Sequence, residues 1–177
     1  MESMQVKEVH EIQALTKGHV LYFFKNPDQY ISNVIEFVLS GLERNEYSII
    51  IENDRLTPLI KKSLTEKLNN KCLEKVMFVN NYDFYYAKGD FRVNSIFDYL
   101  PNLIEEYSEH KLAVRSWAHV EWRDEPEVRV KLSVSEKEAD LIVAKTKLLS
   151  VCAYDSERVS HELKEGLLLC HNFLINE

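Results

Sequence analysis

The sequence predicts an α/β three-layer sandwich, in which a mostly parallel central sheet of about five strands is flanked by helices. Short apolar and β-branched runs alternate with stretches of helical period. The chain has 177 residues, of which 45% are hydrophobic. This length and composition are typical of one globular domain. The five predicted strands are His19–Phe24, Tyr47–Ile51, Lys75–Val79, Leu112–Trp117 and Leu148–Tyr154.

Helix-start chemistry follows the first strand. Asn26 can cap a helix, Pro27 suits its first position, and Gln29 completes a capping-box spacing. The apolar stripe of this helix is Ile31, Val34, Ile35, Val38 and Leu42. The pattern predicts a helix that ends near Asn45.

Three more helices are expected farther along the chain. The second begins at Thr57-Pro58, and the third covers about Val93 to Glu109, with Pro101 as a start or a kink. The last runs from about Ser160 to Ile175. Its inward residues would be Leu163, Leu167, Cys170 and Leu174.

Residues 126–146 fit two patterns. Strict alternation of apolar and polar residues from Val128 to Val134 indicates a strand. Pro126 suits a helix start, and the apolar residues Val128, Leu132, Ala139, Ile142 and Val143 also lie on one helical stripe. The second pattern favours a helix, and the strand stays open as an alternative.

Composition argues against several functional classes. Lys and Arg total 22 against 29 Asp and Glu, so the formal net charge is -7 and direct nucleic-acid binding is not expected. No apolar run approaches the roughly 18 residues that span a bilayer, and the N-terminus lacks a signal-peptide pattern. We therefore expect a cytoplasmic protein without membrane contact. Cys72, Cys152 and Cys170 lack metal-site or disulfide spacing and are expected to be reduced, buried thiols.

The chain has no glycine-rich phosphate cradle. GxxxxGK[ST] and GxGxxG are absent, and the turn after the first strand, Lys25 to Gln29, has no glycine. His119 and Glu121 are two residues apart, a spacing that could serve a metal or an acid/base pair but is weak evidence for either. The sequence predicts no cofactor and no metal site.

Ligands of parallel α/β sheets bind at the carboxyl ends of the strands. Residues just past the predicted strands are rich in acids, amides and aromatics. A small organic ligand is expected to contact Glu52, Asp54, Tyr82, Asp83, Arg115, Trp117, His119, Glu121 and Trp122.

Each of these residues also has a structural interpretation. Glu52 and Asp54 could only cap helices, and the tryptophans could only pack in the core. Arg115 lies amid apolar neighbours in a predicted strand, so it needs a carboxylate partner, for which Glu52 or Glu121 are natural candidates.

Five aromatic residues lie between Tyr82 and Phe91. Such a segment could cover an apolar ligand, pack over the sheet edge, or contact a partner protein. The residues expected to contact a partner are Phe84, Tyr85 and Tyr86.

Several stretches resemble the MEDS family, named for methanogens, methylotrophs and the sensory part of the dichloromethane-dehalogenase repressor. The matching segments are HVLYFFKNPDQYISNVIEFVLSGLERNEYSIIIEND, NNYDFYYAKGDF, VRSWAHVEW and LLSVCAYD. The resemblance spans about residues 18 to 155, and the last predicted helix also fits.

The resemblance implies a RecA/KaiC-like fold without a Walker A loop, a single domain over 1–177 with its core at about 18–175, and a helix from about Glu125 to Thr146. It matches the family's acidic position after the second strand to Glu52. The family's fourth-strand pattern of an aromatic, a small residue and then Glu-Met is loosely matched by Trp117 to Glu121.

The resemblance also implies a sensory or regulatory role instead of ATP hydrolysis. We expect a non-enzymatic domain that binds a small organic ligand and signals to a regulatory partner protein. Because fewer than twenty residues precede the first predicted strand, any effect on transcription would pass through that partner. The alternatives are an interaction module in a stress or sporulation circuit, or a degenerate nucleotide hydrolase that uses Glu52 with Glu121 or His119.

Overall fold

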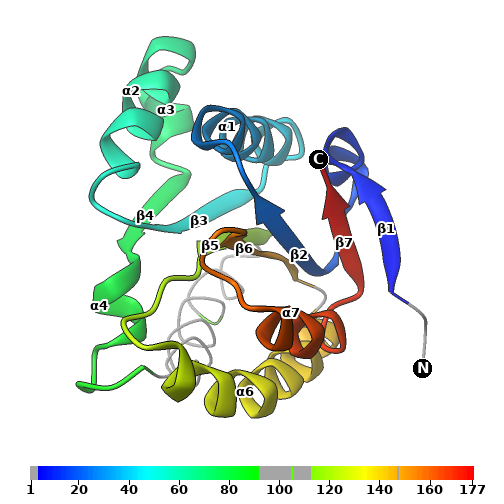
Figure 1. Cartoon of the computed structure of the whole chain (residues 1–177). Coiled ribbons are helices and arrows are strands. Elements are labelled where there is room, and N and C mark those ends of the chain that lie inside the picture. Colours follow the sequence, from blue (N-terminus) through cyan, green and yellow to red (C-terminus); the bar gives the residue numbers. More distant parts are fainter. Residues whose placement is uncertain (1–3, 92–104, 106–112, 147) are drawn as a thin grey trace.

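The computed structural model describes residues 4–91, 105, 113–146 and 148–177. Within them, seven parallel strands form one sheet with helices on both faces, which confirms the predicted three-layer α/β class (Figure 1). The sheet order is β1-β7-β2-β6-β5-β3-β4. The strands are β1 (Gln5–Glu8), β2 (Gly18–Phe24), β3 (Tyr47–Glu52), β4 (Val76–Asn80), β5 (Val114–His119), β6 (Leu149–Asp155) and β7 (Phe173–Asn176).

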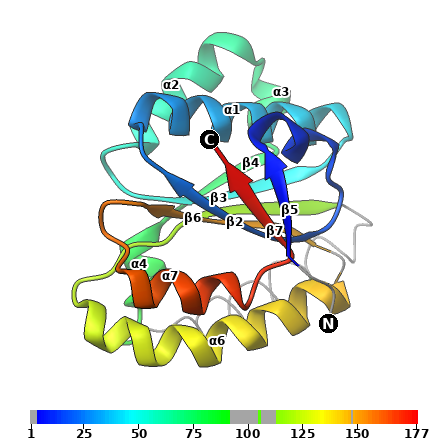
Figure 2. The same cartoon turned by 45° about the vertical axis from the view of Figure 1, so that its right-hand side comes forward.

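The described helices divide between the two faces of the sheet (Figure 2). One face carries the 3-10 helix η1 (Val9–Ala14) and the helices α1 (Pro27–Glu43), α2 (Thr57–Lys67) and α3 (Asn70–Leu73). The other carries α4 (Asn81–Tyr85), α6 (Glu125–Thr146) and α7 (His161–Leu168). Each described helix is too short or too polar to cross a bilayer.

Alternation along the strands fills a separate core on each face. Val20, Tyr22 and Trp117 pack toward α1, whereas Leu21 and Cys152 pack toward α6 and α7. The sheet is therefore covered on both sides, as parallel sheets require.

The start of α1 forms as its sequence predicts. Asn26 caps the helix, and its side-chain oxygen accepts from the backbone N–H groups of Asp28 (2.9 Å) and Gln29 (3.1 Å). Pro27 occupies the first turn. The helix ends at Glu43, and Asn45 just beyond it has a positive φ of 59°.

The segment 126–146 is a helix. Val128 and Leu132 are buried, whereas Val130 is 74% exposed and Val134 61% exposed. Residues four apart share a helix face, so Val128 and Leu132 lie on the buried face and Val130 and Val134 on the exposed one. The apolar alternation that indicated a strand therefore does not correspond to one buried face. The predicted helix at 93–109 lies outside the described residues, apart from residue 105.

Two predictions about the sheet need correction. It has seven strands instead of about five, because β1 is polar apart from Val6 and gives no apolar run. The last helix was predicted to reach Ile175 but ends at Leu168, and β7 follows. Just before β7, Asn172 joins β2 instead of a helix: its N–H donates to the carbonyl of His19 and its side-chain oxygen accepts from the His19 N–H, both at 2.9 Å.

The fourth predicted strand is displaced. It was expected to end at Trp117, and β5 continues to His119. Trp117 and His119 therefore belong to the strand and, being two residues apart, point to the same face.

Candidate functional site

Buried polar side chains converge where three neighbouring strands end. We call Glu52, Asn53, Asn81, His119 and Glu121 the carboxyl-edge network. They lie at the ends of β3, β4 and β5, or directly after them. None is more than 6% exposed. Because β5, β3 and β4 are adjacent in the sheet, these ends lie side by side.

Glu52 is held by three donors. Its Oε2 accepts from the hydroxyl of Tyr30 at 2.6 Å, and its Oε1 accepts from the N–H of Asn53 at 2.8 Å. His119 Nδ1 lies 2.6 Å from the same Oε1. Because a carboxylate accepts hydrogen bonds, His119 donates from Nδ1.

Glu121 is held by two side-chain amides. Its Oε1 accepts from Nδ2 of Asn53 at 2.7 Å and of Asn81 at 2.8 Å, and Arg158 Nη1 lies 3.4 Å from Oε2. Burial opposes ionisation of this carboxyl, but His119, the two amides and Arg158 together hold the pKa of Glu121 below its usual value. A buried negative charge is thus stabilised at the edge of the sheet.

A chain of aromatic side chains supports the network from the α1 face. Trp117 Nε1 donates to the Tyr30 hydroxyl at 2.9 Å, and Tyr30 in turn donates to Glu52. Burial raises the pKa of Tyr30 well above its ordinary value, and the neighbouring Glu52 charge adds to the effect. Tyr30 therefore keeps its proton and stays a donor to Glu52.

Two buried polar atoms of the network have no hydrogen-bond partner among the described residues. They are Nε2 of His119 and Oδ1 of Asn81. Buried polar atoms in folded proteins are nearly always paired. Both atoms can therefore bond an additional group that reaches the network.

A hollow of about 400 Å³ lies over the network, and we call it the edge hollow. Its lining residues are Asn53, Asp54, Arg55, Asn80, Tyr82 and Asp83. Asn80 donates to Asp54 at 2.8 Å and accepts from the N–H of Asp83 at 2.9 Å, which caps α4. Asn53 belongs both to this lining and to the network behind it.

A second cavity, of about 810 Å³, opens between η1 and α1. It is lined by polar side chains such as Asn33 and Glu36, and it contains none of the predicted site residues. This cavity is larger than the edge hollow, but none of its lining residues belongs to the carboxyl-edge network. The edge hollow, which three predicted residues line, is therefore the better candidate for the site.

The network could in principle hold a cation. Glu52, His119 and Glu121 each place an atom within 4.8 Å of the others. However, Tyr30 and the amides of the network already occupy these carboxylate oxygens. The carboxylate oxygens are therefore already hydrogen-bonded within the protein.

Three of the nine predicted ligand contacts, Asp54, Tyr82 and Asp83, line the edge hollow. Glu52, His119 and Glu121 come together behind it. The two tryptophans do not line it. Trp117 is buried toward α1, and Trp122 packs on the other face, with its ring 5.1 Å from the guanidinium of Arg158.

Arg115 lies at the opposite end of its strand. Its predicted partners, Glu52 and Glu121, were wrong, because Nε pairs with Glu46 at 2.6 Å. Nη1 donates to the carbonyl of Phe37 and the hydroxyl of Ser40. Arg115 is the second residue of β5, so its side chain meets the end of α1 instead of the carboxyl edge.

The expected partner-contact residues are mostly inside the protein. Phe84 and Tyr85 are buried in the core between the sheet and α6, so they do not form a contact surface. Short helix α4 turns them inward. Tyr86 is half-buried, and its hydroxyl accepts from the N–H of Arg123 at 2.7 Å.

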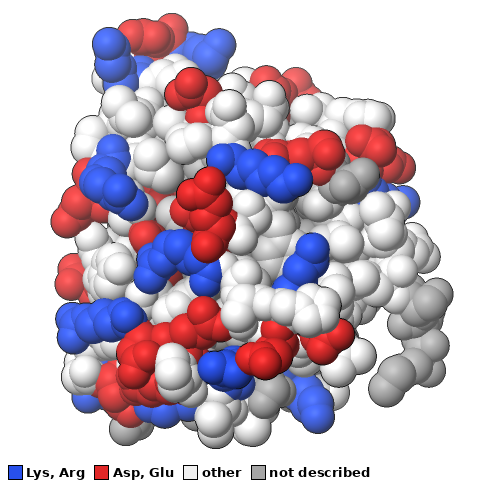
Figure 3. Space-filling model, viewed as in Figure 1, with Lys and Arg blue, Asp and Glu red and all other residues white. Residues whose placement is uncertain are grey.

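The turn after β2 cannot act as a phosphate cradle in its observed form. Asn26 occupies the free N–H groups of Asp28 and Gln29 at the start of α1. The carboxylate of Asp28 also stands in this first turn, where it would repel a phosphate. The face in Figure 3 shows Lys and Arg interspersed with Asp and Glu, without a broad basic area.

Four residues of the site, Tyr30, Asn53, Asn81 and Arg158, were not among the predicted ligand contacts, although Asn53 and Asn81 are among the amides that follow predicted strands. Tyr30 lies in the first turn of α1, which approaches the carboxyl end of the sheet. This position next to the carboxyl ends of the strands was the one feature of the sequence that could have assigned Tyr30 to the site. Arg158 follows β6 in a turn without a helical or strand pattern, so nothing in the sequence marked it.

Comparison with protein families gives one match. The model described as "MEthanogen/methylotroph, DcmR Sensory domain" (MEDS) matches residues 18–172. No curated protein sequence matches the chain.

Proposed function

Because the chain belongs to the MEDS family of sensory domains, we propose that it detects a small organic molecule in the edge hollow and signals to a partner protein. The observation that carries this proposal is Asn53, which lines the hollow and bonds both Glu52 and Glu121. A molecule that reaches Asn53 thus contacts a residue that is hydrogen-bonded to both buried carboxylates.

The lining suggests the chemistry of the ligand. Asp54 and Asp83 offer carboxylate oxygens, and Tyr82 offers an aromatic face that is stacked on Tyr86 at 5.9 Å. Carboxylates and an aromatic ring favour ligands with amine or hydroxyl donors over anions. We therefore propose a small amine or alcohol as the ligand class.

The same contacts offer a route for the signal. Asn80 holds Asp54 and caps the start of α4. A ligand that takes over the carboxylate of Asp54 would release Nδ2 of Asn80 and change the position of α4. Ligand binding then favours one of two arrangements, which a partner protein can distinguish.

The alternative of nucleotide hydrolysis has less support. The first turn of α1 is capped by Asn26 and carries Asp28, and the hollow presents two carboxylates instead of a basic cradle.

The chain's three cysteines form no disulfide, which agrees with the proposal of a cytoplasmic sensor.

A thermal-shift screen tests the proposal. Small amines, alcohols, carboxylates and nucleotides are added separately to the full chain, and a ligand must raise the melting temperature increasingly, with a logarithmic dependence, as its concentration rises above its Kd. We expect a hit among the amines or alcohols, with loss of the shift in Asp54→Asn and Tyr82→Ala. Glu66→Ala, an exposed acid on α2, serves as the matched control and should keep it.

Two results would contradict the proposal. One is stabilisation by nucleotides alone. The other is a hit whose shift is the same in Asp54→Asn and Tyr82→Ala as in the unmodified chain, which would place the ligand elsewhere.

A further inference from the structure

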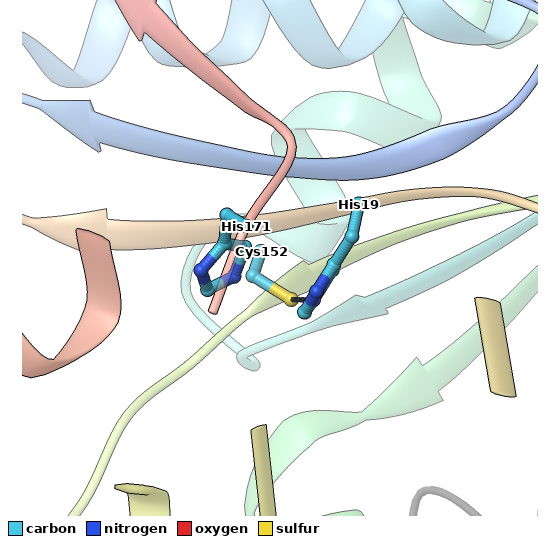
Figure 4. A group of neighbouring side chains, drawn as sticks. All are labelled: His19, Cys152 and His171. Carbon is cyan, nitrogen blue, oxygen red and sulfur yellow. Dashed lines mark hydrogen bonds between the residues drawn. The ribbon is translucent and has the colours of Figure 1, made fainter. Parts of the chain in front are cut away.

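We infer that His19, Cys152 and His171 form a binding site for one thiophilic metal ion, with Zn²⁺ as the expected ion. This group, the His–Cys cluster, lies on the α7 face of the sheet and shares no residue with the edge hollow or its network (Figure 4). The inference does not depend on the proposed ligand.

Three separate segments bring the cluster together. His19 is on β2, Cys152 is on the adjacent β6, and His171 lies between α7 and β7. His19 is opposite Ser150 in the register, and Cys152 is two residues farther on, so its side chain shares that face. The potential ligand atoms all lie within 4.8 Å of one another.

The contact between His19 and Cys152 is close to metal-site geometry. His19 Nε2 lies 3.3 Å from Cys152 Sγ. Zinc binds imidazole nitrogen at about 2.0 Å and thiolate sulfur at about 2.3 Å, so tetrahedral ligands of one ion lie roughly 3.5 Å apart. The two side chains need only a small adjustment to share an ion.

Backbone carbonyls hold both histidine rings in the orientation that metal binding requires. His19 Nδ1 lies 3.0 Å from the carbonyl of Cys170, and His171 Nδ1 lies 2.7 Å from the carbonyl of Leu167. Since a carbonyl only accepts, each Nδ1 carries the hydrogen and each Nε2 keeps its lone pair. Metal-binding histidines have this second-shell arrangement.

Burial also keeps both rings neutral. It lowers the pKa of His19 well below its usual value, with His171 adding to the effect, and it lowers the pKa of His171 to about 4. The ring centroids are 3.9 Å apart, a distance that two charged imidazoles would not tolerate. Neutral imidazole is the form that binds metals.

The donor set selects the type of ion. One thiolate and two imidazoles suit zinc and similar borderline or soft ions. Calcium and magnesium prefer oxygen ligands, and the three cluster residues offer no carboxylate. The three protein ligands leave a fourth coordination position for water or another donor.

Cobalt titration tests the inference on the full chain, after reduction and removal of metal by a chelator. We expect one equivalent of Co²⁺ to produce a sulfur-to-cobalt charge-transfer absorption, and Zn²⁺ to displace it and raise the melting temperature. Cys152→Ser and His171→Gln should each weaken binding at least tenfold. Cys72→Ser, at a half-buried thiol on α3, should not.

The cobalt titration still identifies the metal-binding cysteine if Cys152→Ser fails to fold. The chain has three cysteines, so a charge-transfer absorption that persists in both Cys72→Ser and Cys170→Ser assigns the thiolate to Cys152. The inference is overturned if the unmodified chain gives no such absorption, because the close contact is then only a thiol–imidazole hydrogen bond. It is also overturned if Cys72→Ser or Glu121→Gln, instead of the cluster variants, abolishes binding.

Discussion

The two buried polar clusters of this protein differ in chemistry and in position. The carboxyl-edge network lies where β3, β4 and β5 end, with Glu52 bonded to Tyr30 on the α1 face, and it stabilises two carboxylates with amides, Tyr30 and Arg158. The His–Cys cluster lies on the opposite face, near the start of β2, and it is built from neutral rings and a thiol. One sheet thus carries an oxygen-rich cluster and a cluster of nitrogen and sulfur donors that share no residue.

The largest effect is expected from Glu52→Ala. It leaves the Tyr30 hydroxyl and His119 Nδ1 buried without their acceptor. Removing one partner of a buried charged group costs about 3–5 kcal/mol of unfolding free energy. Urea denaturation measures the change, with Glu66→Ala as a control that should stay within about 0.5 kcal/mol. A loss as small as that of the control would show that Glu52 does not hold the network together.

Arg115→Met should have the next largest effect. It leaves the carboxylate of Glu46 without its buried partner, and we expect a loss of about 2–3 kcal/mol in urea denaturation. Ligand binding at the edge hollow and cobalt binding at the His–Cys cluster should both persist in the folded variant. Loss of either, with the fold intact, would show that the amino end of β5 is coupled to that site.

Gly18→Ala should disturb the two clusters unequally. Gly18 has a φ of 128°, and an added Cβ would lie 2.5 Å from the ring of Phe173 on β7. We expect a loss of about 1–3 kcal/mol and weaker cobalt binding, because β7 follows His171 directly. The ligand-induced thermal shift should not change.

Gly166→Ala is the matched control for that substitution. Gly166 lies in α7, and an added Cβ meets nothing within 4 Å. It should stabilise the protein by about 0.5–1 kcal/mol. Equal destabilisation by both glycine substitutions would contradict the account of Gly18.

The smallest effect concerns pH. Because the pKa of Glu121 is lowered in the folded protein, the unfolded chain binds more protons in this range. The stabilisation from Glu121 is fully present above its unfolded pKa, near 4.5, and is lost as pH falls through the lower folded value. Glu121→Gln should therefore flatten the fall of urea-denaturation free energy below pH 4.5, whereas Glu66→Gln should not. An unchanged slope in Glu121→Gln would argue against a stabilised charge.

The sequence predicted the carboxyl-edge network better than the His–Cys cluster, for a physical reason. Parallel strands place their carboxyl ends together, so residues such as Glu52 and His119 could be grouped from their strand positions alone. Arg115 was misassigned because it lies at the other end of β5, where its partner is Glu46.

The His–Cys cluster was hidden by the error in the last helix. His171 falls inside the segment predicted as helix to Ile175, so its place beside β2 was not expected. Leu163, Leu167, Cys170 and Leu174 keep a helical spacing across the true end of α7, so local periodicity does not mark the break. The contacts that accompany the break are long-range ones, between Asn172 and His19.

The most direct test of the central claim is a crystal structure of the chain soaked with a hit from the thermal-shift screen. The account predicts electron density for the molecule in the edge hollow, against Tyr82 and Asn53, with Asn80 displaced from Asp54. Density in the cavity between η1 and α1, with the contacts of Asn53 and Asn80 unchanged, would contradict it.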